Sequence, residues 1–283
     1  MPDSPPQLPL VHLSSLWFQV TGLLCNLECT HCLVDSSPQN RSMPFLDRET
    51  IRTYLREADA LGVKEIYFTG GEPFLHREMT GILEDALAAF PTTVLTNGTL
   101  ITERTAEALG ALQARSRYSL EVRVSIDHPD PERNDAVRGA GAHEKAIRAV
   151  LRLERAGLLP IVTATEMLQG SEGSAYERFL SALSEAGVRR PRVKILPVFR
   201  TGKIEETGPL LTPPMLEGVD PLLLQCASAR AVTALGIYAC PILVGKGAAL
   251  LGAGSLANGL GDVPLFHPAC TTCYETGMTC ANA

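Results

Sequence analysis

The chain has 283 residues, of which 45% are hydrophobic and 20% charged, and its formal net charge is -6. This length and composition suit one or two globular domains, and mild acidity without a basic block argues against a general nucleic-acid-binding protein. No apolar run is long enough for a membrane span, and the N-terminus lacks the basic start of a signal peptide, so we expect a cytoplasmic protein without a membrane partner.

The first 200 residues show a regular succession of predicted elements. Residues 1–14 are rich in proline, and we predict a disordered or loosely docked arm there. The β-rich runs that follow predict strands at residues 16–20, 64–69, 92–96, 119–126, 159–165 and 192–196. Amphipathic segments between them predict helices at residues 47–61, 78–90, 102–112, 142–156 and 174–186.

This alternation of strands and helices predicts a parallel sheet with helices outside it. A closed eightfold barrel usually needs about 250 residues, which is more than the segment 15–200 provides. We therefore predict an α/β fold, a partial (β/α)6 TIM-like barrel whose chemistry lies at the C-terminal ends of its strands. Residues 201–283 are richer in Gly, Pro and Cys, and we expect a small second module held together by its ligands rather than by a large core.

A first group of cysteines, Cys25, Cys29 and Cys32, follows the first predicted strand with the spacing C-x3-C-x2-C. Three thiolates on one short loop can hold three irons of a cubane cluster and leave the fourth iron open to a ligand. A zinc site would need a fourth ligand, and His31 is too close to two of these cysteines in the sequence to close a tetrahedron easily. The spacing alone does not decide between the two metals.

The cysteine loop resembles the signature of the radical SAM superfamily, in which the residue at the position of His31 lies against the adenine of S-adenosylmethionine. Further strand ends are similar to the cofactor motifs of this family, in the family's order: Gly70-Gly71-Glu72-Pro73, Thr96-Asn97-Gly98, Ser125-Ile126-Asp127 and Arg138-Gly139. The first of these is similar to the GGEP motif that receives the methionine amino group. The resemblance further implies that Ser125 and Arg138 hold the methionine carboxylate.

This resemblance covers roughly residues 15–200. It implies that a [4Fe–4S] cluster on the three cysteines cleaves S-adenosylmethionine reductively, and that the resulting 5′-deoxyadenosyl radical abstracts hydrogen from a substrate. It also implies an electron donor of the flavodoxin or ferredoxin type.

A second group of cysteines lies towards the other end of the chain. Cys226, Cys240, Cys270 and Cys273 suffice for a complete [4Fe–4S] cluster or for a four-cysteine zinc site. Their arrangement resembles the Twitch module, the one-cluster short form of the SPASM domain, which implies an auxiliary [4Fe–4S] cluster. Cys280 is left over, and three interpretations stay open for it: an alternative ligand, an inert residue or a catalytic thiol.

The resemblance to Twitch and SPASM enzymes implies two kinds of reaction. One is oxidation of a small molecule with help from the auxiliary cluster, and the other is crosslinking, epimerisation or oxidation of a peptide. Only about 14 residues precede the first predicted strand, which favours a small molecule or a peptide delivered by a separate protein. The alternative outside the enzymes is a non-catalytic iron–sulfur protein that transfers electrons. Such a protein needs no pocket for S-adenosylmethionine, so the cofactor motifs would have no function in it.

Overall fold

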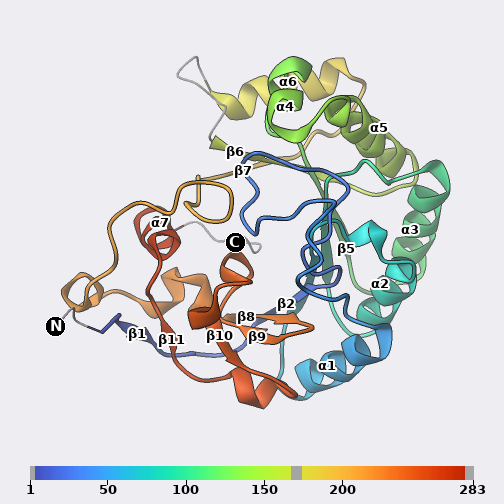
Figure 1. Cartoon of the computed structure of the whole chain (residues 1–283). Helices are drawn as coiled ribbons and strands as arrows, with labels where there is room; N and C mark the ends of the chain where they lie inside the picture. The colour runs from blue at the N-terminus through green and yellow to red at the C-terminus, as the bar shows by residue number, and fades with distance from the viewer. Residues whose placement is uncertain (1–3, 167–173, 278–283) are drawn as a thin grey trace.

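The computed structural model describes residues 4–166 and 174–277, and within these ranges its main sheet has nine strands in the order β10-β9-β8-β2-β3-β4-β5-β6-β7 (Figure 1). Its parallel part comprises β2 (Ser15–Gln19), β3 (Glu65–Thr69), β4 (Thr92–Thr96), β5 (Leu120–Ser125), β6 (Ile161–Thr165) and β7 (Val193–Leu196). Since β7 and β10 are both edge strands, the sheet stays open. The prediction of an α/β fold with a partial barrel is confirmed.

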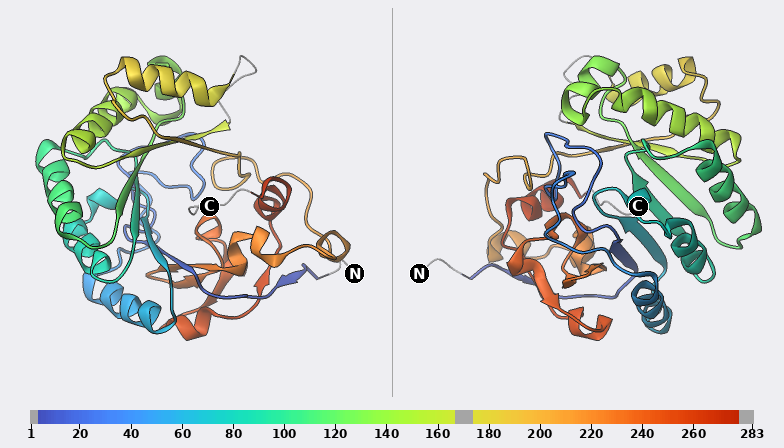
Figure 2. Two further views of the ribbon diagram at one scale, coloured as in Figure 1. Left: turned by 180° about the vertical axis from the view of Figure 1, so that it is seen from behind. Right: turned by 45° about the vertical axis from the view of Figure 1, so that its right-hand side comes forward.

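Helices cover the outer, convex side of the barrel strands, and the C-terminal module lies across the open side of the barrel (Figure 2). The outer helices are α1 (Arg48–Ala60), α2 (Met79–Leu87), α3 (Glu103–Arg115), α5 (Ala142–Arg155) and α6 (Ala175–Glu185). Each lies within a few residues of a predicted helix. Helix α4 (Pro131–Arg138) was not predicted from the sequence, and in the described part of the chain no α-helix follows β7 until α7 (Pro268–Thr276).

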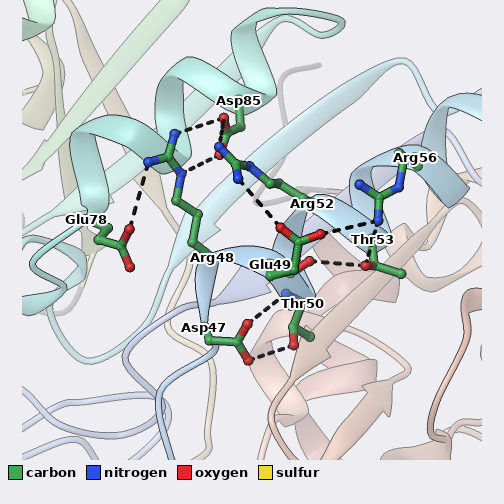
Figure 3. Close-up of polar contacts among 9 residues, drawn as sticks. All are labelled: Asp47, Arg48, Glu49, Thr50, Arg52, Thr53, Arg56, Glu78 and Asp85. Atoms are coloured by element: carbon green, nitrogen blue, oxygen red, sulfur yellow. Dashed lines mark hydrogen bonds and ion pairs between the residues drawn. The ribbon is translucent and has the colours of Figure 1, made fainter.

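Charged side chains join α1 to α2 on this outer side. Arg48 and Arg52 both form paired hydrogen bonds with the Asp85 carboxylate, and their Nε atoms lie 2.6 and 2.9 Å from its Oδ2 (Figure 3). Asp47 caps α1 by accepting a hydrogen bond of 2.8 Å from the Thr50 amide, as expected for an aspartate at that position. These contacts fix the helix that directly follows the cysteine loop.

The C-terminal module continues the barrel sheet instead of forming a separate layer. Its strand β8 (Ala229–Thr233) pairs in parallel with β2, and β9 (Gly236–Tyr238) and β10 (Leu250–Gly252) add antiparallel strands. Gly236 has a φ of +135°, and a Cβ there would lie 2.4 Å from the Gly252 carbonyl oxygen. A side chain at this position is therefore incompatible with the pairing of β9 and β10.

The N-terminal segment, expected to be loosely docked, is paired along the C-terminal module. β1 (Gln7–Leu8) pairs with β11 (Val263–Pro264), and the Val11 amide donates a hydrogen bond of 2.8 Å to the Ala227 carbonyl. Leu8 is buried in this contact. Backbone pairing and burial of an apolar side chain together explain why the described part of this segment is docked, contrary to the expectation.

Buried apolar side chains form two cores, one on each side of the main sheet. The outer core fills the space between the strands and the helices and includes Phe18, Phe68 and Leu109. The inner core joins Trp17 and Tyr67 of the barrel to side chains of the C-terminal module. The module was expected to depend on its ligands, but it shares this extended core with the barrel. In the part of the chain that the structure describes, no helix is both long and apolar enough to cross a membrane.

Candidate functional site

A central cavity of about 230 Å³ opens on the inner side of the barrel, where the parallel strands end. Most of the site residues predicted for the first cluster and its cofactor line it: Cys25, Cys29, His31, Cys32, Gly70, Gly71, Asn97, Ser125, Asp127 and Arg138. Glu72 and Pro73 are buried behind this surface and do not line the cavity. The folded chain thus brings together residues that are spread over more than 100 positions of the sequence.

The cysteine loop directs backbone amides at its own sulfur atoms. The Leu27 amide lies 3.4 Å from the Cys25 Sγ, and the Ser36 amide lies 3.2 Å from the Cys32 Sγ. Burial raises the pKa of Cys25 to about 12 and also raises that of Cys29. Since a thiol must lose its proton to bind a metal, occupation of this site would release protons, and the N–H···S contacts would stabilise the thiolates.

The Gly70-Gly71 turn lies directly against the cysteine loop. The Gly71 amide donates a hydrogen bond of 3.0 Å to the Gly22 carbonyl. A Cβ at Gly71 would lie 2.0 Å from the Leu24 carbonyl oxygen, so only glycine fits there. This close approach of two backbones forms one wall of the central cavity.

The Glu72 side chain is a buried hydrogen-bond acceptor, which the GGEP motif alone did not indicate. Its Oε1 accepts hydrogen bonds from the Thr96 hydroxyl (2.7 Å) and the Phe74 amide (3.0 Å), and its Oε2 accepts one from the Asn97 amide (2.8 Å). Burial raises the pKa of this fully buried carboxyl, although the three donors oppose the shift. Glu72 therefore holds the turn after β4 in place, and the Asn97 Nδ2 then lies 3.7 Å from the Cys25 Sγ.

Asp127 is the centre of a buried ionic group at the end of β5. Its Oδ2 lies 2.6 Å from Arg138 Nε and 2.8 Å from His31 Nε2, and its Oδ1 accepts a hydrogen bond of 3.1 Å from the Thr165 amide. Burial alone would raise the pKa of Asp127, but the Arg138 charge and the His31 contact outweigh it and hold this pKa well below its ordinary value. The Arg138 guanidinium also reaches the cysteine loop, with Nη1 4.0 Å from the Cys29 Sγ.

Helix α4, which the sequence analysis missed, positions Arg138. The helix begins after Asp130, which accepts a hydrogen bond of 2.9 Å from the Arg133 amide, with Pro131 at its first position. The Asp127 amide donates to Asn134 Oδ1 (3.0 Å) on this helix. An aspartate cap followed by proline is a recognisable start signal, and it could have predicted the helix.

The second group of cysteines lines another cavity, inside the C-terminal module. All four predicted ligands, Cys226, Cys240, Cys270 and Cys273, face this four-cysteine cavity, whose other walls are mainly apolar. Ile242 lines both this cavity and the central one. The two cavities therefore adjoin each other at Ile242. Cys280 lies outside the described residues.

The segment after β7 links the two cysteine groups. The Lys203 amide donates a hydrogen bond of 2.9 Å to the Cys32 carbonyl, and a Cβ at Gly202 would lie 2.2 Å from that same oxygen. Further along, the Glu206 Oε2 lies 3.2 Å from Nε2 of His267, the residue that caps α7. Since α7 carries Cys270 and Cys273, this segment ties the first cysteine loop to the second.

The chemistry of the donor set fits a site-differentiated cluster at the first group. Among residues 4–166 and 174–277, no three His, Cys, Asp or Glu side chains are close enough to hold a single metal ion. Three thiols from one loop, with amides aimed at their sulfur atoms and a cavity open beside them, instead suit a cluster of several irons. The second group offers four thiols around one cavity, which is the number of ligands that a complete [4Fe–4S] cluster takes.

Several cavity residues escaped the sequence analysis, among them Trp17, Arg123 and Thr163. A signal for Arg123 was present in β5, where Glu121, Arg123 and Ser125 alternate with the buried valines 122 and 124. In a barrel strand, one face packs on the helices and the other faces the interior. Charged residues on alternate positions of a buried strand therefore indicate an interior binding surface.

The family model of the radical SAM superfamily matches residues 20–183. A probable GTP 3′,8-cyclase of Methanosarcina mazei is 32% identical over 167 residues, which cover 54% of this chain and 47% of that protein. The mycofactocin maturase MftC of Mycolicibacterium smegmatis is 34% identical over 134 residues, 47% of this chain and 32% of the relative. The chain thus spans half or less of the length of these relatives.

Among solved structures, native anSMEcpe with bound AdoMet and the Cp18Cys peptide superposes with a TM-score of 0.62 and 17% sequence identity. The match covers 86% of this chain and 79% of that one. At this level of identity the likeness concerns the fold, and it extends beyond residue 183 into the C-terminal module.

Proposed function

The chain belongs to the radical SAM superfamily, and we propose that it cleaves S-adenosylmethionine reductively and removes a hydrogen atom from a substrate in the central cavity. The observation that carries this proposal is that three cysteines of one loop share a cavity with the Gly70-Gly71 turn and the Asp127–Arg138 pair. When bound, a [4Fe–4S] cluster and S-adenosylmethionine together supply a carbon-centred radical that can attack an unactivated C–H bond.

The residues around the cavity have separate tasks in this proposal. Cys25, Cys29 and Cys32 hold the cluster, and the backbone of the turn at Gly70 and Gly71 receives the methionine amino group. Ser125 and Arg138 hold the methionine carboxylate, for which a guanidinium offers a bidentate partner. Asp127 keeps Arg138 in place through the contact of 2.6 Å, and it holds His31, which we assign to the adenine, through the contact of 2.8 Å.

Glu72 and Pro73 complete the turn without touching the cofactor. Glu72 fixes the backbone at Asn97, so both turns that face the cluster depend on one buried carboxylate. Burial of these groups also keeps water away from the reacting atoms, which a highly reactive radical requires.

We further propose an auxiliary [4Fe–4S] cluster on Cys226, Cys240, Cys270 and Cys273, in a Twitch-like module. Two observations support this assignment: the four thiols line one cavity, and Ile242 alone lines both that cavity and the central one. A cluster in a cavity that adjoins the substrate's can accept an electron, so the expected outcome is oxidation of the substrate. A flavodoxin- or ferredoxin-type protein would supply the electron that starts the reaction.

The substrate in this proposal is a small molecule or a peptide. One relative is named for GTP and another for the maturation of mycofactocin, so the comparisons support both kinds. A peptide-modifying maturase that crosslinks or epimerises its substrate is therefore the second candidate.

Anaerobic reconstitution with iron and sulfide, followed by dithionite and S-adenosylmethionine, tests the proposal. The full chain should form 5′-deoxyadenosine, and the triple variant Cys25/Cys29/Cys32→Ala should not. Equal, background amounts from both proteins would favour a non-catalytic electron carrier. An iron content of about eight per chain supports two clusters, whereas about four, accompanied by zinc, would overturn the auxiliary cluster.

A further inference from the structure

The Glu206 side chain lies where three segments of the chain meet. Its Oε1 accepts hydrogen bonds from the Gly202 amide, at 3.2 Å, and from the Lys246 ammonium. Its Oε2 lies 3.2 Å from Nε2 of His267. Glu206 lines neither the central cavity nor the four-cysteine cavity, and no step of the proposed cofactor binding uses it.

The contact with Gly202 holds a turn that touches the first cysteine loop. The Lys203 amide, next in the chain, donates a hydrogen bond of 2.9 Å to the Cys32 carbonyl. The Ile204 amide donates to the Thr201 carbonyl at 3.3 Å, and Thr201 is fully buried. A shift of this turn would therefore break the hydrogen bond to Cys32 or move the backbone of that proposed ligand.

The contact with His267 reaches the helix that carries two cysteines of the second group. His267 Nδ1 accepts a hydrogen bond of 3.2 Å from the Ala269 amide, so the proton of the neutral imidazole is on Nε2 and points at Glu206. The His267 carbonyl accepts a hydrogen bond of 2.8 Å from the Cys270 amide. The ring is 5% exposed, so packing also holds it in place. One histidine thus connects Glu206 to the backbone of Cys270.

The contact with Lys246 reaches another segment of the second group. The Lys246 amide donates a hydrogen bond of 3.0 Å to the carbonyl of Leu243, the last residue of the short helix that follows Cys240. The hydrogen bond from the Lys246 ammonium also holds the pKa of the Glu206 carboxyl below its ordinary value, so this group is ionised at neutral pH. A single carboxylate is therefore linked to the segments of Cys32, Cys240 and Cys270.

We infer that Glu206 is a positioning residue that couples the two cysteine groups, so that metal bound by one group favours metal binding by the other. Metal binding orders the segments that supply its ligands. If Glu206 passes this order to the other group, metal binding there costs less conformational entropy. Linkage then requires the effect to be reciprocal. The inference rests on the proposed function for the identity of the two clusters, and it adds an interaction between them.

Hydrogen–deuterium exchange of the full-length triple variant Cys25/Cys29/Cys32→Ala tests the inference, because this variant keeps only the second group of cysteines. Exchange of residues 24–37 is measured before and after anaerobic loading with iron and sulfide, and separately with Zn²⁺ alone. Loading should slow this exchange about fivefold, at the lower end of measured couplings, because Glu206 is partly exposed. An unchanged exchange rate would overturn the inference, and so would the failure of both probes to bind.

Substitutions added to the triple variant show whether Glu206 carries the effect. Glu206→Ala should remove most of the slowing, whereas Glu206→Gln, with one acceptor oxygen in place of two, should keep part of it. The matched control is Glu57→Ala. Glu57 also joins the barrel to the C-terminal module, by accepting a hydrogen bond of 2.6 Å from the Leu256 amide, but neither residue lines a cysteine cavity. Equal slowing with and without Glu206→Ala would contradict the assignment.

The reverse experiment keeps the inference testable if the triple variant does not fold. In Cys270/Cys273→Ala the first group is intact, and its loading with iron and sulfide should slow exchange of residues 268–276, again through Glu206. Absence of slowing in either variant that still unfolds cooperatively would overturn the inference.

Neither experiment uses S-adenosylmethionine, so the two proposals can fail separately. If the unaltered chain forms 5′-deoxyadenosine and loading slows exchange in neither variant, the coupling is wrong and the proposed function stands. If loading slows exchange and no 5′-deoxyadenosine forms, the coupling stands and the reaction is wrong.

Discussion

Arg138 Nε lies 2.6 Å from Asp127 Oδ2, in a site where the aspartate is fully buried. This contact connects the end of β5 to helix α4 and, through His31 on the same oxygen, to the cysteine loop. A single carboxylate thus orients two residues that we assign to S-adenosylmethionine.

Replacing Asp127 by Asn should raise the KM for S-adenosylmethionine roughly tenfold or more, because Arg138 and His31 lose the charge that orients them. Loss of one partner of a buried ion pair should also lower the free energy of unfolding by about 3 kcal/mol. Asp85→Asn is the matched control, since Asp85 pairs with Arg48 and Arg52 away from the cavity (Figure 3). Steady-state formation of 5′-deoxyadenosine should show the KM effect for Asp127→Asn alone; an equal effect of both variants would contradict it.

The pH dependence of this stabilisation follows from the depressed pKa of Asp127. Because the folded-state pKa lies below the unfolded value of about 4, the stabilisation is fully present above that value and is lost as the pH falls through the folded-state pKa. The difference in unfolding free energy between the unaltered chain and Asp127→Asn should therefore be constant from about pH 5 to pH 8. It should shrink in more acidic solution, as measured by urea denaturation.

The stabilisation of the fold by Glu72 should depend on pH in the opposite direction to that by Asp127. Burial raises its pKa above the unfolded value of about 4.3, so its contribution is most favourable below that value and declines as the pH rises through the folded-state pKa. Glu72→Gln removes this titration. The advantage of the unaltered chain over the variant in urea denaturation should therefore become smaller between about pH 4 and pH 8, and an advantage that grows with pH would contradict the assignment.

Gly71→Ala should displace the first cluster. The added methyl group would lie 2.0 Å from the Leu24 carbonyl oxygen and 2.7 Å from the Cys25 amide, so the cysteine loop must move. We expect the reconstituted variant to lose about half of its iron, the share of one of two clusters. Gly247→Ala is the control, because nothing lies within 4 Å of a Cβ there, and its iron content should be unchanged.

Arg230→Met should change the auxiliary cluster. Arg230 is fully buried beside the second cysteine group, and it donates to the carbonyls of Cys226 (2.6 Å), Gly259 (2.6 Å) and Gly261 (2.8 Å). A fixed positive charge next to a cluster favours its reduced, more negative form. We therefore expect a more negative reduction potential in an EPR-monitored titration of the variant. The exposed Arg189→Met should leave the potential unchanged.

The barrel was predictable because its signals are local. Each strand from residue 16 to residue 196 alternates with a segment of helical periodicity, and caps such as Asp47 mark the helix starts. The cysteine loop and the turns at Gly70 and Asn97 each follow a strand, so the topology placed them at one end of the sheet. Their presence around one cavity agrees with that placement.

The C-terminal module was harder to predict because its order depends on distant partners. β9 and β10 have three residues each, too few for a recognisable pattern, and β8 is fixed by its pairing with β2. The docking of the N-terminal segment likewise depends on β11 and Ala227, far away in the sequence. The interior role of Glu72 could not be read from the GGEP motif, since it depends on donors contributed by the next strand and its turn.

The pairing of β2 with β8 also bears on the order in which the molecule can assemble. Ser14 donates to the Ser228 carbonyl across 214 positions of the chain, and β2 lies between β3 on one side and β8 on the other. During synthesis, one edge of β2 therefore stays without its partner until residue 229 has been made. Contacts between residues that lie so far apart in the sequence slow folding, and until they form, a strand edge stays open to wrong pairings. The strand that leads into the cysteine loop thus gains its second neighbour only after all the other parallel strands of the barrel have been made.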